Sequence, residues 1–186
     1  NPKVTQSPPR APSAVTCGAT GQTAEPLSEE EIASLIEAFQ EAAEKAARAG
    51  FDLLELQAGH GYLISQFLNR KINHREDRYG QDRLLFAREA LSAVRRGAPD
   101  LPLILRVSGN EMSPEHGIEK EDLEPLLDLA GQGGVAAVHV GMGSSCFSPP
   151  WYFHHGSLPE QPQWDALSWV RAQTGLPLIA AGRMGR

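Results

Sequence analysis

Short apolar runs alternate with segments of helical periodicity along most of this chain, and this alternation constrains its fold more than any other feature. The apolar runs cover residues 52–57, 103–107, 135–140 and 178–181. The segments of helical periodicity cover residues 29–49, 84–96, 120–130 and 163–174. Near-continuous apolar strands are typical of parallel sheets, whose faces are covered by helical crossovers. The sequence therefore predicts an α/β protein with a parallel sheet.

The first helical segment has a clear beginning. Ser28 followed by Glu31 forms a capping-box pattern directly ahead of the apolar periodicity. Residues 62–68 have the spacing of a short helix, whereas the highly charged residues 69–82 predict a loop.

Segments rich in glycine and polar residues follow each predicted strand. They cover residues 57–62, 106–111, 141–146 and 182–183. A Rossmann domain carries a turn with three glycines between its first strand and a helix, and residues 141–146 lack the third glycine. In a (β/α)₈ barrel the chemistry lies just after the carboxyl ends of the strands, which fits all four segments. We therefore expect a TIM-barrel segment, roughly half of an eight-stranded barrel.

Four strands do not close such a barrel. We expect the chain to be a fragment whose missing strands come from the rest of a longer chain, with association of half-barrels into a homo-oligomer as the alternative. Residues 1–27 hold five of the fourteen prolines and predict an irregular segment that wraps a surface, and residues 28–186 are expected to form one domain.

Composition excludes several classes of protein. The net charge of −6 disfavours a nucleic-acid partner, and no apolar run approaches the roughly 18 residues that span a bilayer. Cys17 and Cys146 are too few for a disulfide scaffold, so we expect a reducing, cytoplasmic location. His154 and His155 lack ligand spacing with Cys146, and no metal site is expected.

The densest group of reactive side chains is Gln57, His60 and Tyr62, directly after the first predicted strand. An amide, an imidazole and a phenol can together bind a carbonyl oxygen and protonate a neighbouring carbon. The alternative is a strand-to-helix turn whose polar side chains are satisfied locally. Both interpretations stay open at this point.

Further candidates lie after the other strands. Arg106 stands inside an apolar strand, where it either forms an ion pair with Glu55 or contacts an anion or polar ring in the barrel mouth. Gly182 and Arg183 follow the last strand, at a position that binds phosphate in many barrels, although glycine also ends many strands. The aromatic residues of 148–155 either cover an apolar substrate or pack on one another.

Several of these segments resemble the Old Yellow Enzyme family of flavin oxidoreductases. The similar segments are AGFD at 49–52, GHGYLISQFL at 59–68, NHREDRYG at 73–80, RVS at 106–108 and PLIAAGR at 177–183. Residues 106–111 are most similar to the branch that contains 2,4-dienoyl-CoA and 2-enoate reductases. The resemblance implies strands four to seven of a TIM barrel that holds FMN. NADH or NADPH would reduce the flavin, which would then pass a hydride to an activated C=C bond.

The resemblance also implies a role for each candidate residue. Tyr62 would donate a proton, and His60 with Gln57 would bind the substrate carbonyl, although Gln57 stands where many relatives have histidine. Arg106 would lie beside the flavin ring, and Gly182 with Arg183 would contact its phosphate. Any 4Fe–4S cluster or FAD of the longer branch would lie outside this chain. The alternatives are a flavin-dependent amine or CoA-thioester dehydrogenase, and a non-catalytic scaffold.

Overall fold

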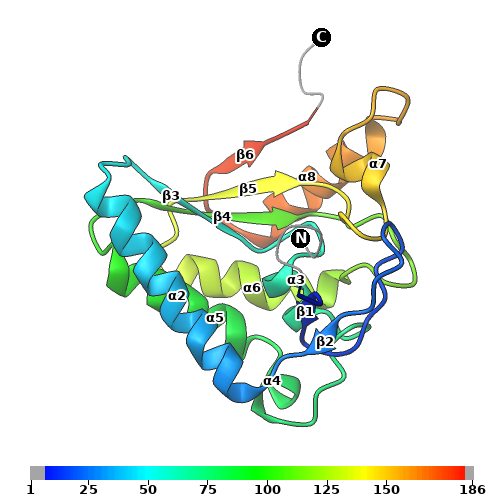
Figure 1. Cartoon of the computed structure of the whole chain (residues 1–186). Helices are drawn as coiled ribbons and strands as arrows, with labels where there is room; N and C mark the ends of the chain where they lie inside the picture. The colour runs from blue at the N-terminus through cyan, green and yellow to red at the C-terminus, as the bar shows by residue number, and fades with distance from the viewer. Residues whose placement is uncertain (1–6, 183–186) are drawn as a thin grey trace.

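A parallel four-stranded sheet is the centre of the computed structural model, which describes residues 7–182 (Figure 1). Its strands are β3 (Leu54–Gln57), β4 (Leu103–Ser108), β5 (Ala137–Gly141) and β6 (Leu178–Ala180), and they lie side by side in chain order. All three neighbouring pairs are parallel. The prediction of a parallel sheet from the alternating pattern is therefore confirmed.

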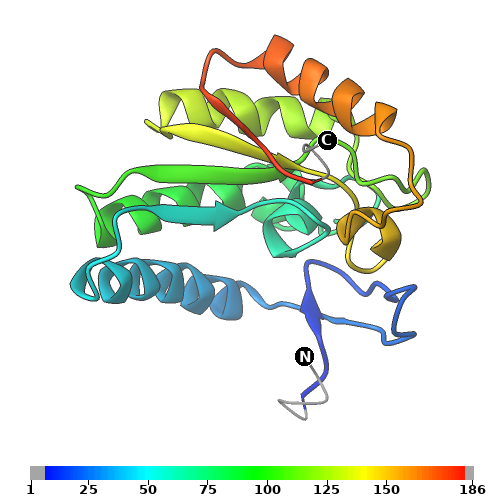
Figure 2. The same cartoon turned by 90° about the horizontal axis from the view of Figure 1, so that it is seen from above.

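Three of the helices cover one face of the sheet. The helices within the described residues are α2 (Glu29–Arg48), α3 (Leu63–Leu68), α4 (Arg78–Gln81), α5 (Leu85–Gly97), α6 (Lys120–Gln132), α7 (Pro149–Tyr152) and α8 (Gln161–Gln173). Helices α5, α6 and α8 lie against the sheet, and α2 packs beside α5 (Figures 1 and 2). Within the described residues, no helix is both long enough and apolar enough to cross a membrane.

The longest helix begins as the sequence predicts. Ser28 Oγ accepts from the backbone N–H of Glu31 at 3.2 Å, and the Glu31 carboxylate accepts from the backbone N–H of Ser28 at 2.8 Å. The capping box is thus confirmed. The charged loop predicted over residues 69–82 is interrupted by α4, whose four residues are too few to produce a periodic pattern. Helix α7 is missed for the same reason.

The two faces of the sheet differ in what they carry. Leu56, Leu105, Val107, Val138 and Val140 are buried on the face that the helices cover. The alternate positions of the strands face the open side, and they include the polar residues described below. In a closed barrel this open side is the interior, because the helices of a (β/α) barrel form the outer ring.

The described part of the N-terminal segment contains two strands of two residues each. β1 (Arg10–Ala11) pairs in parallel with β2 (Glu25–Pro26). The Arg75 guanidinium donates to the carbonyl oxygens of Pro12 and Leu27, at 2.9 and 2.5 Å. These bonds attach the N-terminal segment to the loop between α3 and α4.

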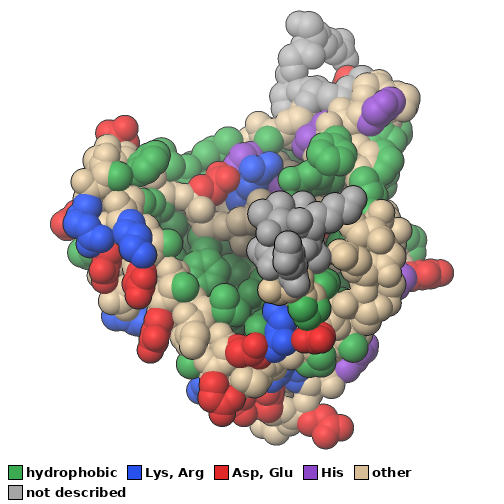
Figure 3. Space-filling model, viewed as in Figure 1, with side chains coloured by type: hydrophobic (Ala, Val, Ile, Leu, Met, Phe, Trp, Pro, Cys, Tyr) green, Lys and Arg blue, Asp and Glu red, His purple; other side chains and the backbone are tan. Residues whose placement is uncertain are grey.

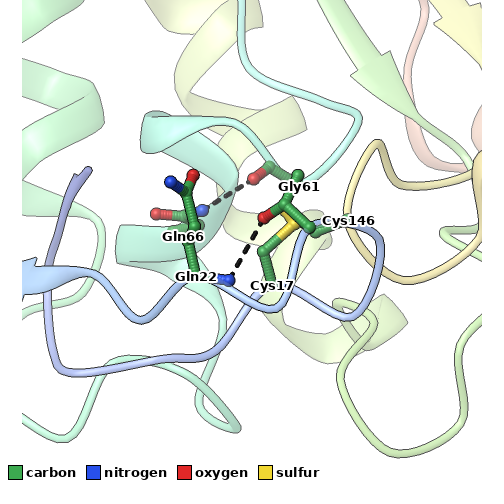
Figure 4. The surroundings of a disulfide bond; sticks show 6 residues. Cys17, Gln22, Gly61, Gln66 and Cys146 are labelled. Carbon is green, nitrogen blue, oxygen red and sulfur yellow. Dashed lines mark hydrogen bonds between the residues drawn. A yellow bond between two sulfur atoms is a disulfide. The ribbon is translucent and has the colours of Figure 1, made fainter. Parts of the chain in front are cut away.

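A disulfide joins this segment to the loop after β5 (Figure 4). It links Cys17 to Cys146 across a sequence separation of 129 residues, and Ala19 N–H donates to the Cys146 carbonyl at 2.9 Å. Gly61 and Gln66 lie beside it in Figure 4. The low cysteine count did not predict this bond, because only the fold brings the two loops together.

Candidate active site

Polar side chains gather on the open face of the sheet, near the carboxyl ends of its strands. The register pairs Gln57 with Arg106, Arg106 with His139, and His139 with Ile179. Parallel register puts paired residues on the same face, so these four side chains form one row across the sheet. Figure 3 shows acidic, basic and histidine side chains together in a hollow of this face. We call the four paired residues, Gln57, Arg106, His139 and Ile179, the strand row.

Gln57 determines which ring nitrogen of His60 carries the proton. Its Oε1 accepts from the backbone N–H of Gly59 at 2.9 Å, so its Nε2 is the atom that faces His60 Nδ1 at 3.2 Å. Because Nε2 can only donate, Nδ1 of the neutral imidazole is the acceptor and the ring proton lies on Nε2. The backbone N–H of His60 donates to Ser108 Oγ at 2.8 Å, which ties this turn to the end of β4.

His60 is a neutral donor at physiological pH. Burial first, and then the charges of Arg106, His154 and His139, lower its pKa from 6.5 to about 4. The residue is 0% exposed, and its Nε2 is buried without a hydrogen-bond partner among the described residues. The Nε2–H of His60 is therefore a hydrogen-bond donor that has no partner among the described residues and no contact with solvent.

Tyr62 lies at the N-cap of α3 and is exposed. Its Oη is 3.2 Å from the Oη of Tyr152. The part of the phenol that is buried, followed by its interactions with Tyr152, raises the pKa of Tyr62, while Ser145 and Arg106 oppose this rise. Tyr62 therefore keeps its proton at neutral pH.

A buried carboxylate, that of Glu111, binds the turn that carries His60 and Tyr62. Glu111 is 1% exposed and accepts from Gly61 N–H at 2.8 Å, Ser65 Oγ at 2.5 Å and Ile118 N–H at 3.1 Å. Burial raises the pKa of Glu111. Sequence reasoning missed this role, because the contact joins loops about 50 residues apart.

Arg106 combines both interpretations of its position. Its Nη1 lies 3.6 Å from Glu55 Oε1, whereas the other oxygen of Glu55 binds His139 Nδ1 at 2.6 Å. Glu55 is thus shared, and Arg106 Nε is buried with no hydrogen-bond partner among residues 7–182. His139 was not singled out from the sequence, although a lone histidine among valines in a strand is the signal that identifies it.

This arrangement fits a flavin. The isoalloxazine ring has an electron-rich N1–C2 edge that accepts hydrogen bonds, and Arg106 supplies a positive charge on the open face together with a buried Nε that has no partner among the described residues. Buried donors without partners are costly unless a ligand satisfies them. The strand row is therefore chemically suited to hold FMN.

Gly182, one of the last two predicted positions, lies beside the aromatic residues of 148–155. Gly182 has a φ of +89°, and a Cβ at this position would collide with the His154 ring. Arg183 lies outside the described residues. The Tyr152 ring packs edge-on against His60, with centroids 5.1 Å apart. Within residues 7–182, no group of three or more His, Cys, Asp or Glu side chains is arranged to hold a metal ion.

Comparison with known proteins identifies the family of this chain. The sequence profile of the NADH:flavin oxidoreductase / NADH oxidase family matches residues 3–186. The chain belongs to this family. The resemblance to flavin oxidoreductases is thereby confirmed, and the four parallel strands are part of the TIM barrel of these proteins.

Individual members of the NADH:flavin oxidoreductase family are considerably longer. A metal reductase of Desulforamulus reducens is 40% identical over 144 residues, which is 75% of this chain and 21% of the relative. An NADPH dehydrogenase of Clostridium acetobutylicum is 36% identical over 151 residues, which is 74% of this chain and 44% of the relative. The structure of a 2-naphthoyl-CoA reductase complex superposes with a TM-score of 0.79 at 26% identity, covering 96% of this chain and 28% of that one. The chain thus spans less than half the length of these relatives.

Proposed function

We propose that the full-length protein is an FMN-dependent oxidoreductase that uses NADH or NADPH to reduce C=C bonds activated by a carbonyl group. The observation that carries this proposal is the strand row beside a protonated phenol. Arg106 places a positive charge, with an Nε that is unpartnered among the described residues, on the face that an electron-rich ring would contact, and Tyr62 holds a protonated phenol at the adjacent strand end. Membership of the flavin oxidoreductase family supports the same chemistry.

Arg106 would hold the flavin ring, and Gly182 with Arg183 would contact its phosphate. When bound, FMN supplies a hydride that it has taken from the nicotinamide cofactor. The Arg106 charge is only partly compensated, because Glu55 lies closer to His139 than to Arg106. Arg106 is therefore able to stabilise negative charge on the ring.

The substrate oxygen would be bound by the Gln57 amide, which the buried His60 orients. Gln57 Nε2 carries two hydrogens, and His60 Nδ1 accepts only one of them, which leaves the other for a carbonyl oxygen. His60 stays neutral and locks the Gln57 amide in this orientation. Donors with fixed direction stabilise the charge that develops on the oxygen.

Tyr62 would then protonate the substrate carbon next to the carbonyl group. Its raised pKa ensures that the phenol is protonated at pH 7. General-acid help of this kind is worth about 10²–10⁴-fold in rate. Tyr62→Phe should therefore slow the reaction of the reduced protein with an enone by about that factor, while flavin reduction by NADH or NADPH stays near the wild-type rate.

Stopped-flow measurements on the full-length protein, following the two half-reactions separately, test this assignment. Tyr79→Phe is a matched control, because it removes a tyrosine hydroxyl that binds Glu89 and is remote from the strand row. Equal losses in both half-reactions, or no loss in either, would contradict the role of Tyr62. Reduction of the flavin by an amine, with no turnover of enones, would favour the dehydrogenase alternative. A full-length protein that binds no flavin would indicate a scaffold.

The rest of a longer chain would complete the barrel. An apolar pocket of about 450 Å³ follows the free edge of β3, and Phe39, Leu54 and Leu63 are among its lining residues. This pocket suits the preceding strand of the barrel. Likeness to a reductase solved with 2-naphthoyl-CoA supports an unsaturated CoA thioester as the substrate. A 4Fe–4S cluster and FAD would lie elsewhere in the full-length chain. Iron and flavin analysis of the full-length protein tests this, and gel filtration tests whether it forms a homo-oligomer.

We also propose a cytoplasmic location. Cytosolic reductants keep most thiols reduced, so the Cys17–Cys146 bond would be open in the cell and would close on oxidation. Alkylation of thiols before lysis, followed by mass spectrometry, should then modify both cysteines. A disulfide that survives this treatment would indicate an oxidising compartment.

A further inference from the structure

The hydroxyl of a second tyrosine lies against the proposed proton donor. Tyr62 and Tyr152 are 90 residues apart in sequence, and their Oη atoms are 3.2 Å apart. We propose that Tyr152 is a positioning residue and proton partner of Tyr62, which holds its phenol in place and returns a proton to it after each donation. This inference rests on the proposed function and deepens it, because it states how the site recovers its proton.

The loop after β5 fixes α7, and with it Tyr152, beside the site. Ser148 Oγ donates to the Glu111 carbonyl at 2.5 Å and accepts from Ser144 N–H at 2.7 Å. The Tyr152 N–H donates to the Ser148 carbonyl at 3.2 Å. Gly143 has a φ of +77°, and a Cβ there would collide with the backbone nitrogen of Tyr152. The backbone therefore sets the position of Tyr152.

Two ring contacts orient its side chain. The ring of Tyr152 meets His60 at an interplanar angle of 81° and Tyr62 at 79°, with centroids 5.1 and 6.3 Å apart. Both contacts have the edge-to-face geometry that aromatic pairs prefer. A ring held by two neighbours loses little further freedom when its hydroxyl forms a hydrogen bond, so the pair of phenols is preorganised.

The hydrogen bond between the two phenols can run in either direction. When Tyr62 donates, its proton is held, in agreement with its raised pKa. When Tyr152 donates instead, the Tyr62 proton is free for the substrate. After Tyr62 transfers its proton to the substrate carbon, its oxygen takes the proton of Tyr152. Tyr152 is only half-buried, so it takes a replacement proton from water.

Tyr152→Phe removes this hydroxyl and keeps the ring contacts. In the full-length, flavin-loaded protein we expect the rate constant at saturating enone to fall roughly 3- to 10-fold, the effect of one hydrogen bond. The half-saturating enone concentration and the rate of flavin reduction should not change. In a Tyr62→Phe background the same substitution should cost nothing further, because Tyr152 acts through the Tyr62 hydroxyl.

Each outcome of this double-mutant cycle decides one point. If the effects of Tyr62→Phe and Tyr152→Phe multiply, or Tyr152→Phe reacts at the wild-type rate, the proton-partner role is overturned while the proposed function stands. If Tyr62→Phe itself reacts at the wild-type rate, the acid of the proposed function is wrong and the role of Tyr152 falls with it. Tyr79→Phe is again the control and should retain wild-type rates.

Discussion

Replacing His60 by asparagine tests whether this histidine is held neutral in the folded protein. His60 has a φ of +59°, and asparagine is among the non-glycine residues that best tolerate this left-handed region. Asparagine is polar and does not titrate. The substitution therefore removes the ionisation of the side chain with little change to the backbone of the turn.

The sign of the expected pH effect follows from the lowered pKa. The folded protein binds a proton at His60 only near pH 4, whereas the unfolded chain binds one near pH 6.5. Proton binding to the unfolded chain therefore lowers the free energy of unfolding progressively as the pH falls below 6.5. The stability that neutral His60 contributes is present above pH 6.5 and is lost as the pH falls through about 4. The full loss is about 3 kcal/mol, since one pKa unit is worth about 1.4 kcal/mol.

Urea unfolding of the full-length protein at pH 7.5 and 4.5 measures this loss. Between these values the wild type should lose about 2.5 kcal/mol more stability than His60→Asn. The exposed His74 provides a control variant, His74→Asn, whose pH dependence should follow the wild type. Parallel pH profiles of the wild type and His60→Asn would refute the reasoning, because His60 would then ionise as freely in the folded state as in the unfolded chain.

Three further outcomes are expected. Arg106→Met should lower the flavin content of the purified full-length protein, because the positive charge and the Nε that is unpartnered among the described residues are lost. An unchanged ratio of flavin to protein absorbance would leave Arg106 as an ion-pair residue only. Cys17→Ser opens a cross-link between residues 129 apart and should cost up to about 5 kcal/mol of unfolding free energy. Dithiothreitol should reproduce this loss in the wild type and have no effect on Cys17→Ser; a wild type indifferent to the reductant would contradict the cross-link. Gly143→Ala should cost about 1–3 kcal/mol through backbone strain, in addition to the collision of its Cβ with the Tyr152 backbone; an unchanged urea midpoint would show that this loop accommodates a Cβ and is not packed against α7.

Local sequence patterns determined the elements of this fold. The apolar runs predict the four strands, and the helical periodicities predict α2, α5, α6 and α8 to within a few residues. The Ser28–Glu31 capping box could be identified as well. These features could be predicted because hydrogen bonding within a helix, capping and face-by-face burial act over a few neighbouring residues.

The chemistry of the site is only partly local. Gln57, His60 and Tyr62 could be singled out because they follow one strand within six residues. The sequence alone does not show that His60 is wholly buried, or that Gln57 fixes its tautomer. Burial and hydrogen-bond direction depend on the surrounding packing, which short-range patterns do not encode.

Only the tertiary structure decided which distant residues meet. The register of three parallel strands aligns Gln57, Arg106 and His139, although each lies on a different strand. Tyr152 reaches Tyr62 across 90 residues, and Cys17 reaches Cys146 across 129. The physical reason is that such contacts depend on how crossovers and loops close over the whole sheet. Before the sheet and its helices pack, the two residues of each pair can lie at many different distances from one another.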